Sequence, residues 1–228
     1  MTRTKNGKGL AAASVAFAVL SAWMMGLLLT ENVSGMDRAG FALAVAWRSE
    51  GLTSFFQTLT QLGSAVVLAP VGVVLIVFLF VRRQRAEAVC LLLTLGGGEL
   101  LNKLLKVVFA RSRPTDFQLV ALPDSFSFPS GHAMIAPAFY CMLALLASRW
   151  LQAQRWAVLV QPLTFALVIL LSLSRVYLGV HFLSDVVTGF CLAMSGYCFV
   201  RYGYGRHLER KRASVGQIAP TPETSYVE

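Results

Sequence analysis

The chain has 228 residues, of which 56% are hydrophobic and 14% are charged, and its formal net charge is +9. A soluble domain usually carries about 25% charged residues, so this composition excludes an ordinary soluble domain and predicts an all-α polytopic membrane protein. The positive charge does not indicate nucleic-acid binding. The Lys and Arg residues gather at the ends of apolar segments, where the positive-inside rule places cytoplasmic cations.

Six apolar segments, each long enough to cross a bilayer, follow one another along the chain. The first comes after a basic start and could be a signal peptide, but its length of about 20 residues and the lack of a clear small-x-small cleavage site favour a retained span. The stretch MDRAGFALAVAWRSEGL after it predicts a short helix that lies along the membrane interface. The expected spans are residues 10–29, 56–81, 87–109, 131–148, 156–174 and 180–201.

These spans form one expected domain, residues 1–203. The segment 204–228 is charged and then rich in Pro, Thr and Ser, which predicts a disordered cytoplasmic tail, with His207 exposed to solvent. The cysteines lie within apolar segments and no Cys-x-x-Cys occurs. We therefore interpret them as small buried hydrophobic residues: Cys90, Cys141, Cys191 and Cys198.

The basic clusters predict the orientation in a plasma (inner) membrane. Both termini and the loops near residues 82–85 and 149–155 carry Lys or Arg and are expected in the cytoplasm, which an even number of spans makes consistent. Arg111, Arg113 and Arg175 fall in loops assigned to the outer side and break this rule. Residues that break a strong rule are candidates for function.

The third span carries polar residues that are costly inside a bilayer. At about 100° per residue, Glu99, Asn102, Lys103 and Lys106 share one side of a helix, and Glu99 and Lys103 form an i,i+4 pair. A charge in the membrane is tolerated when it faces protein or water, so this stripe is expected to point into the bundle. Taken alone, Lys106 could equally extend to the interface.

The stretch Pro129-Ser130-Gly131-His132 opens the fourth span. Ser130 is placed to cap the helix with its hydroxyl, and Gly131 allows a close backbone approach. A helix N-terminus presents free N–H groups that bind anions, and His132 lies in the same first turn. By itself this motif fits a capped helix with an interfacial histidine.

A second histidine, His181, is followed four residues later by Asp185, which could fix its tautomer and stabilise its protonated form. A simple structural contact is the alternative. These two residues and His132 could also bind zinc, but the cations Lys106, Arg113 and Arg175 would surround that metal unfavourably and suit a phosphate better.

Three motifs together resemble the type 2 phosphatidic acid phosphatase (PAP2) family, the membrane lipid phosphate phosphatases related to vanadium haloperoxidases. They are KVVFARSRP (residues 106–114), PSGH (residues 129–132) and SRVYLGVHFLSD (residues 174–185), in the family's order and spacing. The resemblance implies six transmembrane helices with a haloperoxidase-like helical core, as in the bacterial phosphatidylglycerophosphatase B-type enzymes. It covers the motifs directly and the rest of the layout loosely.

The resemblance also implies a role for each motif residue. His181 would attack phosphorus and form a phosphohistidine, Asp185 would orient it, and His132 would protonate the leaving oxygen. The phosphate would be bound by Lys106, Arg113, Ser130, Gly131 and Arg175. Three cations would take the part that Mg²⁺ plays elsewhere, so no metal or other cofactor is expected.

The motifs contact phosphate and do not distinguish among lipids. Phosphatidylglycerophosphate or phosphatidate is the expected substrate, because some undecaprenyl diphosphate phosphatases carry an acidic residue in place of Gly131. Undecaprenyl diphosphate remains the alternative. A transporter or a non-catalytic lipid-binding protein is the alternative from another class, and the oligomeric state is not readable from the sequence.

Overall fold

The computed structural model describes residues 3–150 and 154–218, and every regular element within them is helical. In chain order these elements are α1 (Arg3–Leu29), α2 (Ser34–Ala46), α3 (Glu50–Leu59), the 3-10 helix η1 (Thr60–Gly63), α4 (Ala65–Val81), α5 (Arg85–Leu92), the π-helical segment η2 (Leu93–Gly97), α6 (Gly98–Phe109), α7 (Gly131–Trp150), α8 (Gln154–Tyr177) and α9 (Leu183–Ile218).

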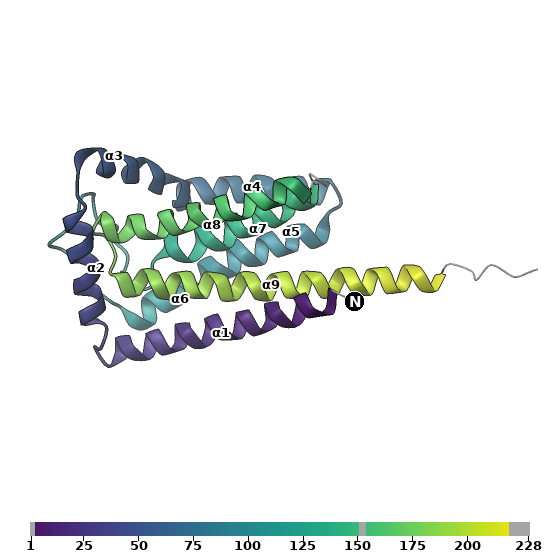
Figure 1. The fold of residues 1–228 in the computed structure, drawn as a ribbon, viewed down its shortest axis with the longest axis horizontal. Coiled ribbons are helices and arrows are strands. Elements are labelled where there is room, and N and C mark those ends of the chain that lie inside the picture. The colour runs from purple at the N-terminus through teal and green to yellow at the C-terminus, as the bar shows by residue number, and fades with distance from the viewer. Residues whose placement is uncertain (1–2, 151–153, 219–228) are drawn as a thin grey trace, which may run out of the picture.

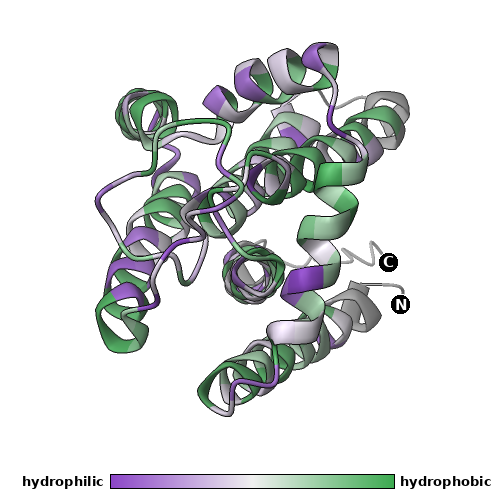
Figure 2. Ribbon diagram, turned by 90° about the vertical axis from the view of Figure 1, so that its left-hand side faces the viewer, coloured by the Kyte–Doolittle hydropathy of each residue, from purple (hydrophilic) through white to green (hydrophobic). Residues whose placement is uncertain are grey.

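Six segments in the described residues are long and apolar enough to cross a membrane, and they correspond to the six expected spans. Their exposed faces carry large apolar side chains, among them Val66, Val107 and Val108, each of which has more than 70% of its surface exposed. Figure 2 views the bundle from the α2 end. The spanning helices are mostly hydrophobic, and hydrophilic segments gather in the connections at this end. Lipid is the environment that matches such surfaces, so this is a multispan membrane protein.

The bundle is centred on α7, which packs against α8 and α9, while α1 lies alongside α9 at the edge (Figure 1). The main core cluster joins α4, α5, α7, α8 and α9 through side chains such as Leu79, Leu91, Phe139, Met142 and Leu171. This packing holds the ends of α6 and α8 and the starts of α7 and α9 together at one end of the molecule.

The expected interfacial helix is present as α2, which lies across the end of the bundle (Figure 1). Two expected spans are not continuous α-helices. Leu59 and Ala65 flank a break formed by η1. The third span contains η2, and three consecutive glycines at the junction of η2 and α6 weaken the regular helix there. The sequence predicted neither break.

The last helix continues beyond the expected end of the last span near residue 201. Helix α9 continues through Ile218, so residues 204–218 of the expected tail are helical, while residues 219–228 lie outside the described part. Two features favour this extension. The buried Tyr204 donates a hydrogen bond to Glu87 Oε1 (2.5 Å), and the segment after it is rich in Arg, Leu, Glu and Lys, which favour helix.

The cysteine and tail-histidine interpretations agree with the structure. Cys90, Cys191 and Cys198 are buried, Cys141 is partly buried, and all four are free thiols. His207 is exposed on the extended part of α9.

Candidate active site

The residues selected from the sequence lie on separate elements that meet at the α2 end of the bundle. Lys106 is in the last turn of α6, His132 in the first turn of α7, Arg175 in the last turn of α8, and Asp185 in the first turn of α9. A cavity of about 690 Å³ is lined by six of the eight: Lys106, Arg113, Gly131, His132, Arg175 and His181. The other two, Ser130 and Asp185, are fully buried and do not line the cavity.

His181 lies in the turn before α9, not within the helix as expected, and it is 3% exposed. Its Nδ1 is 3.4 Å from Asp185 Oδ2, and its Nε2 is 3.2 Å from Arg113 Nη1. Because arginine can only donate, Nε2 is the acceptor, and the proton of the neutral imidazole is on Nδ1, facing Asp185. The lone pair of Nε2 therefore points to the cavity side of the ring, where Arg113 lies.

The charge state of His181 follows from its surroundings. Burial lowers the pKa of His181 from the usual 6.5 to about 4. The Asp185 carboxylate opposes this shift, and the cations Arg113 and Arg175 add to it. The ring is consequently neutral near pH 7, which is the state in which a histidine can act as a nucleophile.

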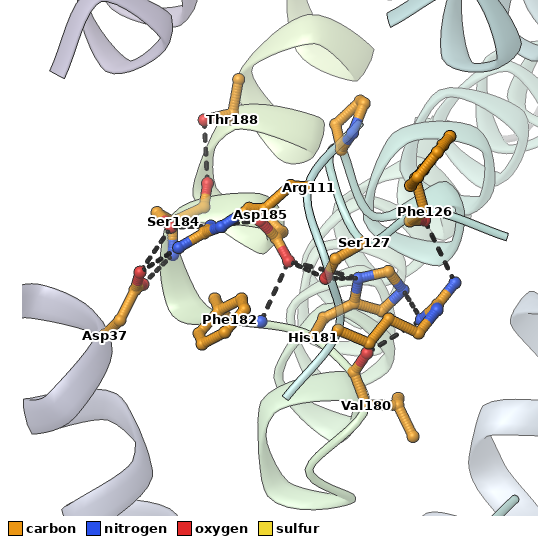
Figure 3. A network of polar contacts seen from close by, with 12 residues as sticks. Asp37, Arg111, Phe126, Ser127, Val180, His181, Phe182, Ser184, Asp185 and Thr188 are labelled. Carbon is orange, nitrogen blue, oxygen red and sulfur yellow. Dashed lines mark hydrogen bonds and ion pairs between the residues drawn. The ribbon is translucent and has the colours of Figure 1, made fainter. Parts of the chain in front are cut away.

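The Asp185 carboxylate is held by four groups in a buried network (Figure 3). Oδ2 accepts hydrogen bonds from Ser127 Oγ (2.5 Å) and from the Phe182 N–H (3.0 Å), and it faces His181. Oδ1 accepts from Arg111 Nη1 (2.5 Å). These donors fix the orientation of the carboxylate and, through it, that of the imidazole.

A second shared carboxylate extends this network to the interfacial helix α2. Arg111 Nη2 donates to Asp37 Oδ2 (2.6 Å), so Arg111 bridges Asp37 and Asp185. Asp37 also accepts from the backbone N–H (2.9 Å) and the hydroxyl (3.0 Å) of Ser184, in the first turn of α9 (Figure 3). A carboxylate at a helix N-terminus is favourable, so Asp37 anchors α2 to the start of α9.

Three cations line the cavity and have no carboxylate partner within 4 Å among residues 3–150 and 154–218. Lys106 donates to the Phe126 carbonyl, and Arg113 donates to the carbonyls of Ser125 (2.7 Å) and Val180 (2.8 Å). Arg175 donates to Thr60 Oγ1 (2.7 Å). Neutral acceptors hold these side chains in place without cancelling their charge, so the cavity favours an anion.

Two buried polar atoms beside the cavity have no hydrogen-bond partner in the described chain: Ser130 Oγ and Arg175 Nε. The expectation that the Ser130 hydroxyl caps α7 is therefore wrong. The Ser130 N–H donates to the Asp185 carbonyl (3.2 Å), which holds this backbone against α9 and leaves the hydroxyl unpaired. A free hydroxyl and the unpaired N–H groups of a helix start suit the oxygens of a phosphate.

The glycine expected to permit close approach is not required by packing. A Cβ on Gly131 would lie 3.5 Å from Asn102 Oδ1, which is ordinary contact. A glycine that packing does require is Gly63 in η1, where a Cβ would come within 2.9 Å of His132 Cδ2. The histidine ring thus packs on the η1 backbone, at the unpredicted break.

The polar stripe of the third span lines this cavity, as expected. Asn102 is buried and donates to the Pro129 carbonyl (3.2 Å), which ties α6 to the segment before α7. Glu99 and Lys103 pair at 3.2 Å on the more open side. The rest of the lining is apolar and comes largely from α4 and η2, including Leu68, Val73, Ile76 and Leu95.

Four residues of the site were not assigned to it from the sequence: Asp37, Thr60, Arg111 and Ser127. Arg111 gave one signal, because it breaks the positive-inside rule. The others are ordinary polar residues, and only their burial and contacts show their part. In the described residues, no three His, Cys, Asp or Glu side chains come together in a group that could hold a metal.

Comparison with known proteins finds a matching family and several relatives. The model of the PAP2 superfamily matches residues 87–208. Phosphatidylglycerophosphatase B of Bacillus subtilis is 34% identical over 80% of this chain and 90% of its own length. An undecaprenyl-diphosphatase of Sulfolobus acidocaldarius is 32% identical over 59% of this chain and 62% of its own.

The fold agrees as well. The crystal structure of a transmembrane PAP2-type phosphatidylglycerolphosphate phosphatase from Bacillus subtilis superposes with a TM-score of 0.78, at 32% identity over 86% of this chain and 98% of that one. The motifs, their convergence on one cavity and these matches lead to one conclusion: the chain belongs to the PAP2 superfamily.

Proposed function

We propose that this protein is a membrane lipid phosphatase that hydrolyses the phosphomonoester of a glycerolipid, phosphatidylglycerophosphate or phosphatidate. The observation that carries the proposal is the neutral, buried His181. Its Nε2 lies 3.2 Å from Arg113 Nη1, and it lines the same cavity as Lys106 and Arg175, cations that have no carboxylate partner in the described chain. The match to phosphatidylglycerophosphatase B of Bacillus subtilis, which covers 90% of that protein's length, supports the substrate class.

The reaction proceeds in two steps. The lone pair of His181 Nε2 forms a bond to phosphorus as the phosphorus–oxygen bond to the lipid breaks, and His132 gives a proton to the leaving oxygen. Asp185 stabilises the positive ring of the phosphohistidine. Water then attacks phosphorus, His132 takes its proton, and the nitrogen–phosphorus bond breaks to release phosphate.

The non-bridging oxygens are bound by the cations Lys106, Arg113 and Arg175, by the free Ser130 hydroxyl and by the Gly131 N–H. Arg113 leaves Nε2 and turns to the phosphate when the substrate arrives, because a dianion is a stronger acceptor than a neutral imidazole. Fixed cations around the transferring group then lower the barrier electrostatically.

The two halves of the cavity suit the two parts of a lipid phosphate. The cationic end receives the phosphate, and the apolar lining from α4 and η2 receives the start of the acyl chains. With both termini in the cytoplasm, the phosphate end opens on the outer side of the membrane. Neither transport nor lipid binding alone requires a buried neutral histidine that is supported by a carboxylate.

The test is phosphate release by the purified protein in detergent, with phosphatidylglycerophosphate, phosphatidate and undecaprenyl diphosphate compared at equal surface concentration. We expect full activity in EDTA and loss of activity in His181→Ala. Full activity of that variant would refute the mechanism, and inhibition by EDTA would support a metal-dependent one. Preference for undecaprenyl diphosphate would favour the alternative substrate.

The acid role of His132 has its own test. His132→Ala should lose on the order of 100-fold in kcat on a lipid phosphate, because a poor leaving group needs the proton, and much less on an activated aryl phosphate. Rates on both substrates are compared with those of the wild type. Equal losses would contradict the acid role.

A further inference from the structure

A second cavity of about 690 Å³ lies between α1, α7 and α9 at the end of the bundle opposite His181. Its polar lining is mainly cationic and comprises Lys8, Arg149, Arg201, Arg206, Arg212 and the single acid Glu209. This site shares no residue with the active-site cavity and plays no part in the reaction above.

The cations of this second cavity have no ion-pair partner in the part of the chain that the structure describes. In the described residues, none of its five cations lies within 4 Å of a carboxylate. Two are held by tyrosines instead: Arg149 contacts the Tyr204 hydroxyl, and Arg201 donates to Tyr197 (3.2 Å). Neutral partners position the guanidinium groups and leave their charge available to an anion.

The depth of the cavity in the membrane indicates what kind of anion it meets. Helix α7 runs from Gly131 in the active site to Arg149 here, which at 1.5 Å per residue is about 27 Å. The hydrocarbon core of a bilayer is about 30 Å thick. The cations therefore lie at the headgroup level of the leaflet opposite the active site.

The remaining lining suits a lipid better than a free ion. Leu10, Leu145 and Leu208 form an apolar wall, and Tyr202 and Tyr204 lie at the level where aromatic residues favour the interface. The cavity also joins α1 to α9, which are otherwise linked by reciprocal hydrogen bonds between Ser14 and Ser195 (3.0 and 2.9 Å). A molecule with an anionic head and apolar chains matches both walls.

We propose that this cavity is a binding site for an anionic phospholipid of the leaflet opposite the active site. The phosphate diester lies among the arginines of α7 and α9, the acyl chains lie on the apolar wall, and the bound lipid holds α1 against α9. Each Lys or Arg at the membrane surface strengthens the affinity for an anionic lipid by about tenfold or less, so a specific site needs several cations.

The experiment measures the binding of phosphatidylglycerol, phosphatidylcholine and inorganic phosphate to the full-length protein in detergent. The variant Arg201→Gln/Arg206→Gln removes two cations of the cavity. The matched control, Arg82→Gln/Arg85→Gln, removes two exposed cations at the same end of the bundle that do not line it. Retained phosphatase activity shows that each variant is folded.

We expect the double variant to bind phosphatidylglycerol about 30-fold more weakly, corresponding to about 1 kcal/mol for each arginine, and the control to match the wild type. The single variant Arg206→Gln, on an exposed side chain, should lose about fivefold and serves if the double variant does not fold. Equal affinity in all proteins would overturn the proposal. An equal loss of affinity for phosphatidylcholine would also overturn it, because the site would then not distinguish headgroup charge. An equal loss of affinity for inorganic phosphate would overturn it as well, because the cavity would then be an anion site that does not require a lipid.

Discussion

At the residue scale, the two ring nitrogens of His181 have different partners, and this difference assigns their roles. Nδ1 faces a carboxylate and carries the proton, whereas Nε2 faces Arg113 and carries the lone pair. The ring is buried among cations, so its neutral form is strongly favoured before substrate binds. A nucleophile ready at neutral pH and a stabilised positive ring afterwards both result from this one arrangement.

The acid side of the pH profile should reflect this environment. The reactive form of His181 is the neutral one, and its lowered pKa means that this form is lost only as the pH falls through about 4. We expect the acid limb of kcat/KM between about pH 5 and pH 8 to follow the second ionisation of the substrate phosphate alone, near pH 6. The substrate ionisation is measured independently by phosphorus NMR, and an additional acid-side group near pH 6.5 would contradict the assignment.

Asp37 is expected to act on catalysis through Arg111, although it lies outside the part of the chain that the PAP2 model matches. Asp37→Asn keeps an acceptor for the Ser184 N–H but leaves Asp185 as the one carboxylate that pairs with Arg111 in the described residues. This weakens the support of Asp185 for the positive ring of His181. We expect kcat to fall about tenfold with a smaller change in KM, because hydrogen bonds to charged groups contribute about 1.5–3 kcal/mol.

The control for this prediction is Asp124→Asn, at an exposed position in the loop between α6 and α7. It should keep the wild-type kcat. A lower melting temperature in Asp37→Asn with an unchanged kcat would show that Asp37 only stabilises the fold.

At the element scale, the site depends on places where regular helix stops. Helix α8 ends at Tyr177, two residues after Arg175, and a short turn then presents His181 before α9 begins at Leu183. Segment η1 interrupts the second span and places Thr60 against Arg175 and Gly63 against His132. The 3-10 geometry of η1 brings Thr60 and Gly63 to the cavity, and a continuous α-helix through residues 50–81 would lack that geometry.

The turn between α8 and α9 should not tolerate a side chain at Gly179. Its φ is +72°, and a Cβ there would lie 2.1 Å from the Phe117 carbonyl oxygen. Gly179→Ala is expected to destabilise the protein by at least about 2 kcal/mol and to abolish most phosphate release, because the strained turn carries His181. Thermal unfolding in detergent and the activity assay measure both.

Gly203→Ala is the matched control. This position is inside α9, and a Cβ there meets nothing within 4 Å. It should leave activity unchanged and stabilise the helix by about 0.5–1 kcal/mol. Similar behaviour of the two alanine variants would show that the α8–α9 turn is flexible enough to absorb the clash.

At the scale of the whole molecule, two chemically different ends share one bundle. Helix α2 lies at one end, and the start of α1 and the extension of α9 lie toward the other (Figure 1). The active-site cavity is lined by residues of the α2 end and the basic cavity by residues of the opposite end. The helices between them present apolar faces outward.

The orientation can be measured with single cysteines in a background that lacks the four native ones. A membrane-impermeant maleimide should label Asp124→Cys in intact cells and Arg82→Cys only after the membrane is permeabilised. Both positions are exposed in the structure, so labelling reports the side of the membrane. The reverse pattern would place the active site in the cytoplasm.

The sequence alone determined the class of fold, the six spans and six of the residues that line the cavity. Apolar length sets membrane spans locally, and phosphate chemistry needs particular side chains whose spacing is visible in one dimension. The interfacial helix was also visible as an amphipathic stretch, because that property too is local.

Only the tertiary structure decided how these residues are held. The hydrogen bonds of Arg111 and Ser127 to Asp185, the bridge from Arg111 to Asp37, and the contact of Thr60 with Arg175 join residues more than 50 positions apart in the chain. The Ser130 hydroxyl is likewise left unpaired because the Ser130 backbone packs against the start of α9. The helical extension through residues 204–218 begins where Tyr204 bonds to the distant Glu87. Burial and hydrogen bonding between distant segments leave no periodic pattern in a single sequence, so these features became visible only when the helices were packed together.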